Sequence, residues 1–178
     1  MKINAKVMST GLIYAALYAA LTIGLSPISY GAIQVRLADV LVAAVPLFGW
    51  AGVLGQGLGV FIANIPSPLG WIDMLNAIPS AVMALAMVQL YKRCDNRSWT
   101  VIVGAIAYSA VIAVSVGYML STVYGLPEWI TSIYVFIGNI VATVAIGFPV
   151  FLAIRRTGIF QKYGFVLGKQ KGNGTQET

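Results

Sequence analysis

Long apolar stretches dominate the chain, and short breaks rich in Gly, Pro and charged residues separate them. Pro and Gly interrupt helices, so each apolar stretch between two breaks predicts a helix. A helix needs about 20 mostly apolar residues to cross the hydrocarbon core of a membrane. Four stretches each predict one such helix, over about 10–25, 73–91, 99–122 and 128–154.

The apolar region 40–65 is ambiguous, because five glycines interrupt it and its length fits either one long span or two short ones. Short, glycine-interrupted segments are tolerated in membranes where other protein covers their backbone. We expect two short helices with a turn near 49–52. The chain would then have six transmembrane helices.

The distribution of basic residues supports six spans, since Lys and Arg accumulate on the cytoplasmic side of membrane proteins. With six crossings, both termini share one side with ten of the eleven basic residues, and Arg36 alone lies on the other side. A five-span alternative would separate the basic turn at 92–97 from the basic C-terminal tail. The pattern therefore predicts that both termini are cytoplasmic.

Composition agrees with an all-α integral membrane protein of one domain. Of the 178 residues, 59% are hydrophobic and 9% are charged, whereas a soluble domain has about 45–50% apolar and about 25% charged residues. We assign 1–163 to the transmembrane domain and expect 164–178 to be a disordered cytoplasmic tail. The net charge of +6 reflects basic residues at helix ends, so it indicates topology rather than a nucleic-acid partner.

The residue types that most catalytic sites need are missing. The chain has no histidine and a single cysteine, Cys94. A Ser/His/Asp triad, a histidine or thiolate metal centre and an intrachain disulfide are therefore excluded. It also has no Walker-type phosphate-binding loop. We predict a protein that is not an enzyme and holds no cofactor of its own.

Polar residues instead gather at the expected outer ends of the helices. A charged residue at a membrane boundary costs little free energy, so each of these residues also has an explanation that involves no ligand. Arg36 and Asp39 are spaced for a local pair, and Asp73 is placed to cap a helix. Glu128 starts a helix whose dipole favours an acid. Because three distant loops bring such residues to one side, we predict a cavity for a small polar molecule. Its candidate residues are Arg36, Asp39, Asn64, Asp73, Asn76 and Glu128.

Further candidates lie deeper or carry aromatic rings. Asn139 lies roughly 16 Å along its helix at ~1.5 Å per residue, where an amide must find another helix or a ligand. Tyr108 shares a helix face with other hydroxyl groups. Tyr30 and Trp71 lie near the outer surface, where aromatic rings either anchor the protein at the interface or stack on a flat ligand.

The first helix carries small residues, Gly11, Ala15 and Ala19, at every fourth position, with Ala16 and Ala20 beside them. Small residues at this spacing let two membrane helices approach closely. The pattern fits packing within the chain or docking of another subunit.

Several short motifs resemble the queuosine-precursor transporter family, QueT. They are AALY at 15–18, ISYGAIQVRLAD at 28–39, AN at 63–64, LGWID at 69–73, VYG at 123–125 and GN at 138–139. The resemblance covers roughly 10–156, and the Tyr-Gly-x-Ile-Gln-x-Arg piece is its most specific part.

The resemblance implies the substrate-binding subunit, or S component, of an energy-coupling factor (ECF) transporter in a prokaryotic cell membrane. It implies a six-helix bundle with an outward-facing site for a queuosine or archaeosine precursor. The small residues of the first helix would meet a transmembrane coupling subunit, and two ATPase subunits would use ATP. Motif positions implied in binding are Gln34, Arg36, Asp39, Asn64 and Asp73.

Two positions depart from the family pattern, which prefers Glu where this chain has Asp39 and Asn139. A carboxylate suits the donor edge of a deazaguanine, whereas an amide offers one neutral acceptor. The same fold carrying another vitamin-like heterocycle is therefore an alternative. A solitary ion-coupled carrier is a second alternative, and no motif supports a membrane enzyme or assembly factor.

Overall fold

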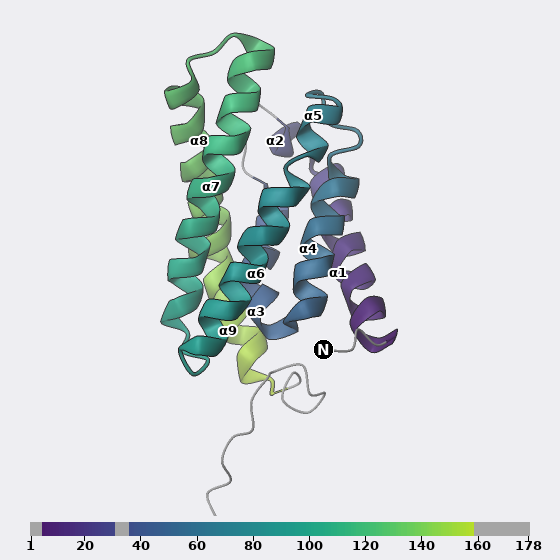
Figure 1. The fold of residues 1–178 in the computed structure, drawn as a ribbon, viewed down its shortest axis with the longest axis vertical. Coiled ribbons are helices and arrows are strands. Elements are labelled where there is room, and N and C mark those ends of the chain that lie inside the picture. Colours follow the sequence, from purple (N-terminus) through teal and green to yellow (C-terminus); the bar gives the residue numbers. More distant parts are fainter. Residues whose placement is uncertain (1–4, 31–35, 159–178) are drawn as a thin grey trace, which may run out of the picture.

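The computed structural model describes residues 5–30 and 36–158, and every regular element in these ranges is helical (Figure 1). The helices pack into one elongated bundle and run up and down its long axis. The all-α prediction is confirmed for this part of the chain. The candidate residue Gln34 and the tail expected at 164–178 lie outside the described residues.

The helices follow the order that the apolar pattern predicts, with several short turns added. They are α1 (Ala5–Gly24), α2 (Ser26–Ser29), the 3-10 helix η1 (Leu37–Ala44), α3 (Val45–Phe48), α4 (Trp50–Ala63), α5 (Trp71–Met74), α6 (Ala77–Arg93), α7 (Trp99–Tyr124), α8 (Glu128–Ile140), the π-helix η2 (Val141–Ile146) and α9 (Gly147–Arg156). Four helical stretches are long and apolar enough to cross a membrane: Ala5–Gly24, Trp71–Arg93, Trp99–Tyr124 and Glu128–Arg156. Two shorter apolar stretches, Leu37–Phe48 and Trp50–Ala63, lie between the first and second of them.

Gly49 divides the ambiguous glycine-rich region. Its φ of 57° lies in the left-handed region, which residues with a Cβ rarely adopt. α3 ends just before this residue and α4 starts just after it. The prediction of two short helices with a turn near 49–52 is confirmed.

The two ends of the bundle differ in chemistry. The start of α1, the α6–α7 turn and the end of α9 lie together at the lower end in Figure 1. We call this the basic end, because it carries Lys92, Arg93, Arg97, Arg155 and Arg156. α2, α5 and the α7–α8 turn lie at the opposite end. The described chain thus starts and finishes at the same end, as an even number of crossings requires.

The contact between α1 and α4 depends on small residues. A Cβ on Gly55 would lie 2.8 Å from the backbone oxygen of Gly11, and one on Gly59 would lie 3.2 Å from Cα of Ala15. Gly11, Ala15 and Ala19 are all buried, and Ala19 packs in a cluster with residues of α4. The structure thus favours packing within the chain for these three residues, one of the two roles that the sequence allowed, because their side of α1 contacts α4.

A π-helical turn interrupts the helix expected over 128–154. Pro149 has no N–H with which to bond the carbonyl of Ala145, and its ring crowds that carbonyl. The wider turn of η2 directly precedes this position and accommodates it. Just beyond it, Gly147 lies against η1, where a Cβ would come within 2.9 Å of the backbone oxygen of Val40.

Candidate functional site

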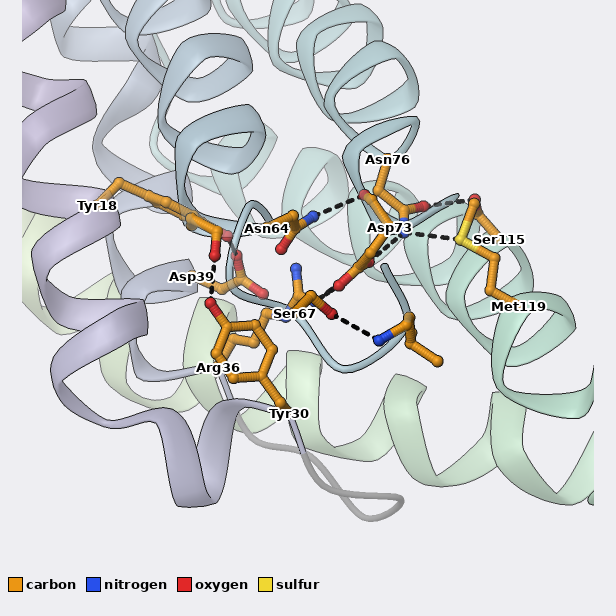
Figure 2. A network of polar contacts seen from close by, with 12 residues as sticks. Tyr18, Tyr30, Arg36, Asp39, Asn64, Ser67, Asp73, Asn76, Ser115 and Met119 are labelled. Atoms are coloured by element: carbon orange, nitrogen blue, oxygen red, sulfur yellow. Dashed lines mark hydrogen bonds and ion pairs between the residues drawn. The ribbon is translucent and has the colours of Figure 1, made fainter. Parts of the chain in front are cut away.

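A buried ion pair between Arg36 and Asp73 forms the centre of the site. Nη2 of Arg36 lies 3.1 Å from Oδ2 and 3.5 Å from Oδ1 of Asp73. Their side chains are 5% and 0% exposed. The sequence also allowed a local pair with Asp39, but the guanidinium bonds Asp73 of α5 instead (Figure 2). The pair joins the start of η1 to the start of a long span.

Asp39 is buried and belongs to a separate contact. Its Oδ1 accepts a hydrogen bond of 2.7 Å from the hydroxyl of Tyr18 on α1. Figure 2 shows Asp39 beside the Arg36–Asp73 pair, so two carboxylates and one guanidinium share this part of the bundle. The sequence analysis did not predict Tyr18 as a site residue, because a tyrosine in an apolar helix carries no sign of its partner.

Asn64 and Asn76 hold Asp73 from two sides. Nδ2 of Asn64 donates to the backbone oxygen of Asp73 over 2.7 Å, and Nδ2 of Asn76 donates to its Oδ1 over 2.8 Å. Ser115 of α7 in turn donates to Oδ1 of Asn76 over 2.6 Å. Asp73 therefore orders a polar network that spans α4, α5, α6 and α7, in place of the helix cap that the sequence allowed.

Tyr30 covers one side of Arg36. Its ring centroid lies 5.8 Å from Cζ of the guanidinium, within the range of a cation–π contact. Its hydroxyl donates to the backbone oxygen of Ala63 at the end of α4. Burial raises the pKa of the Tyr30 phenol, Arg36 opposes this rise and Asp73 adds to it. Tyr30 thus stays neutral and ties α2 to α4.

Arg36 stays charged in spite of its burial. Burial on its own lowers the pKa of a guanidinium, but the charges around Arg36, Asp73 foremost, raise this pKa above its ordinary value. The site therefore presents a fixed positive charge next to Asp73 and Asp39.

Three polar atoms near this network are buried without a partner among the described residues: Nε of Arg36, Oδ1 of Asn64 and Oγ of Ser29. A buried polar group without a hydrogen bond costs about 1–3 kcal/mol. Nε is a donor, Oδ1 is an acceptor and the hydroxyl is both. Unsatisfied donors and acceptors thus occur together in this part of the described structure.

A model of the QueT transporter family matches residues 8–156, which is most of the chain and includes the whole network. This chain belongs to the QueT transporter family. The family and the four apolar spans together make it a membrane protein of a transporter family. No curated protein and no solved structure matches the chain.

This QueT family member has a second polar cluster deeper in the bundle, and Tyr108 belongs to it. The Tyr14 hydroxyl donates to Oε1 of Gln56 over 2.8 Å, and Nε2 of Gln56 donates to the Tyr108 hydroxyl over 3.0 Å. Ser80 lies 3.2 Å from the same hydroxyl. All four residues are buried. Sequence reasoning missed Gln56, although a lone amide in an apolar, glycine-rich segment was the available signal.

Asn139 of this family member is buried in α8, as expected for a residue deep in its helix. Its Nδ2 has no hydrogen-bond partner among the described residues. Thr143 donates to its backbone oxygen over 2.7 Å, and Ser109 lies 3.1 Å from the Thr143 hydroxyl. The structure shows no direct contact between this group and the Arg36–Asp73 pair. Ligand binding at Asn139 therefore stays a prediction.

Two predicted site residues lie away from the network. Trp71 is 70% exposed, which fits the interfacial anchor that the sequence allowed rather than stacking in a cavity. Glu128 is exposed at the start of α8, where the helix dipole favours an acid. The structure does not bring either side chain into the network, and a role for them in ligand binding stays a prediction. Among the described residues, no three His, Cys, Asp or Glu side chains gather as a metal site.

Proposed function

We propose that this protein is the substrate-binding subunit of an energy-coupling factor importer, and that it takes up a 7-deazaguanine precursor of queuosine or archaeosine. The observation that carries the proposal is the buried Arg36–Asp73 network with its unpartnered polar atoms, inside a membrane protein of the QueT family. Ionisable groups inside membrane proteins are expensive and usually mark a functional site.

The chemistry of the network fits the edges of a 7-deazaguanine. This ring system offers a ring N–H and an amino group on one edge and a carbonyl oxygen beside them. The carboxylate of Asp39 accepts a hydrogen bond from Tyr18 and has capacity for further donors. Nε of Arg36 has no partner among the described residues and is a donor that suits the carbonyl oxygen. Asp39 and Arg36 would therefore hold the ligand by two complementary contacts.

The position of the Tyr30 ring favours a flat ligand. Tyr30 is half-buried beside Arg36, at the edge of the network. Aromatic rings favour offset stacking on other flat rings. Of the two aromatic candidates for stacking, Tyr30 is therefore the one we retain.

We propose six spans with cytoplasmic termini. The 14-residue helix α4 measures about 21 Å at ~1.5 Å per residue, which is short of a ~30 Å hydrocarbon core. Eight of its residues are buried against other helices, and protein cover makes short spans acceptable. Six basic residues of the described chain lie at the basic end, Lys6 at the start of α1 among them, which supports a cytoplasmic position for that end.

The coupling subunit would meet the outward face of α1. Ala16 and Ala20 are exposed there, next to Leu12 and Leu17, which are 56% and 48% exposed. Small residues four apart let a second helix approach closely. This exposed pair replaces the buried Gly11, Ala15 and Ala19 as the proposed docking surface. Two ATPase subunits bound to the coupling subunit would supply the ATP-driven step.

Ligand binding is tested by thermal unfolding of the detergent-purified protein with 7-deazaguanines, other nucleobases and vitamins. A ligand at 100 times its dissociation constant adds about 2.7 kcal/mol to stability. We expect a deazaguanine to stabilise the protein, and Asp39→Asn to abolish the effect. Asp95→Asn is the matched control, because Asp95 is exposed in the α6–α7 turn.

Other outcomes would change the proposal. Stabilisation by a different ring alone would keep the binding subunit and replace its substrate. No stabilisation of folded protein by any of these compounds would contradict the binding role and favour a solitary ion-coupled carrier.

The partner role has its own test, which is co-purification with coupling and ATPase subunits. Ala16→Phe should weaken the complex and leave ligand binding intact. The control Ala153→Phe changes an exposed alanine of α9 in the same way and should weaken neither the complex nor ligand binding. If both variants formed the complex equally well, α1 would be ruled out as the docking surface.

A further inference from the structure

A groove of about 310 Å³ lies between α6 and α7, near the basic end of the bundle. Its walls are mostly apolar, and include Met83, Met87, Leu90, Val103, Gly104 and Ala107. α6 and α7 approach each other closely at Gly104, since a Cβ there would lie 2.6 Å from Cγ of Met87. Val103 and Ala107 are exposed, so the groove opens on the outside of the bundle, where the acyl chains of the bilayer lie.

The groove changes in polarity along its length. Gln89 and Arg93 are its two polar lining residues, and Arg93 is the last residue of α6. Met83 lies ten residues before Arg93, which is about 15 Å along a helix at ~1.5 Å per residue. One leaflet contributes about half of a ~30 Å hydrocarbon core. The groove therefore runs from the headgroup level to about the depth that one acyl chain occupies.

The charge at its polar end is positive. Arg93 is exposed, and no carboxylate lies within ion-pair distance of it in the described part of the chain. Lys92 and Arg97 lie close to it in sequence, against one nearby acid, Asp95. Trp99 starts α7 at the same end and is half exposed, as is usual for an aromatic side chain at the membrane interface.

We propose that this groove binds one anionic phospholipid, with an acyl chain along the α6–α7 seam and the phosphate at Arg93. The apolar walls complement the chain, the length matches one leaflet, and the unpaired guanidinium complements a negative headgroup. A zwitterionic lipid satisfies the walls equally well but brings its own cation to Arg93. The preference for an anionic lipid therefore depends on Arg93. The proposal is independent of the transported substrate.

The test is native mass spectrometry of delipidated, detergent-purified protein titrated with dioleoylphosphatidylglycerol or dioleoylphosphatidylcholine. We expect wild-type protein to bind the anionic lipid more tightly. Arg93→Gln should weaken that binding about fivefold, as expected for the loss of one cation near a headgroup. The matched control is Arg156→Gln, which removes an exposed arginine from the same end, outside the groove.

A second pair of variants tests the chain-binding part. Ala107→Phe fills the groove and should weaken both lipids, whereas Ala110→Phe adds the same ring to an exposed position outside it and should weaken neither. Glycerol phosphate should not compete, since it has no acyl chain. Equal affinity of Arg93→Gln and Arg156→Gln for the anionic lipid would overturn the proposal, and so would equal lipid affinity of the two phenylalanine variants. Either result would favour a protein partner in the groove.

Discussion

Arg36 and Asp73 are 37 residues apart in the chain, yet they form an ion pair in which Nη2 and Oδ2 are separated by 3.1 Å. Asp39 is only three residues from Arg36 in sequence, yet the ion pair that Arg36 forms among the described residues is with Asp73. The pair therefore depends on the fold that brings the start of η1 to α5, and its disruption should affect the whole site.

Removal of one partner of this pair should destabilise the protein strongly. Asp73→Ala leaves the Arg36 charge buried and unpaired, and such changes cost about 3–5 kcal/mol. The double variant Arg36→Met, Asp73→Leu removes both charges and should lose less stability than Asp73→Ala alone. Unfolding in detergent measures the free energies of the wild-type protein, of this double variant and of its two single variants, Arg36→Met and Asp73→Leu. Strict additivity in this double-mutant cycle would contradict the pairing.

Tyr18→Phe should weaken the site through Asp39. The substitution keeps the ring and removes the hydroxyl that donates to the carboxylate. Hydrogen bonds to charged groups contribute about 1.5–3 kcal/mol, so the free energy of unfolding should fall by that order. Tyr134→Phe is the control, because Tyr134 is 45% exposed. The two variants would be equally stable if the Tyr18–Asp39 contact contributed nothing.

Gly59→Ala should push α1 away from α4. The added Cβ would lie 2.9 Å from Cβ of Tyr18, and overpacking of this kind costs about 1–3 kcal/mol. Gly24→Ala makes the same chemical change where no atom lies within 4 Å. It should be neutral or slightly stabilising. A Gly59→Ala protein as stable as the control would show that this contact can relax freely.

Gln56→Leu should destabilise the interior of the bundle. The change leaves the hydroxyls of Tyr14 and Tyr108 without their amide partner in apolar surroundings, at about 1–3 kcal/mol for each unsatisfied group. Gln89→Leu alters an exposed glutamine of α6 and should stay within about 0.5 kcal/mol of the parent. Chemical denaturation of the two variants side by side gives the comparison.

Sequence pattern predicted the helices well, because apolar length and glycine breaks act locally. The turn at Gly49 is an example, since one residue with positive φ separates two helices and the glycines mark the region. The π-helical turn before Pro149 was not predicted. A proline inside an apolar stretch shows where a helix is disturbed, but not which of several backbone adjustments accommodates it.

The site was predicted in part. Polar residues at helix ends identified Arg36, Asp39 and Asp73, because charges in an apolar chain are few. Their partners were not predictable, since a polar side chain in a membrane helix does not reveal which helix faces it. Tyr18 was missed for that reason. The small residues of α1 show the same limit, because a four-residue repeat fits α4 and a foreign helix equally well.

The contact between α1 and α4 has a mechanical consequence. Tyr14 and Tyr18 lie one turn apart on α1, and their hydroxyls donate to Gln56 of α4 and Asp39 of η1. Glycines of α4 leave no flexible side chains between the two helices at their closest contact. We expect α1 and α4 to move as one rigid body. A displacement of α1 by a partner on its exposed face would then move Asp39 through its bond to Tyr18, and would move Asn64 at the end of α4 by a similar amount.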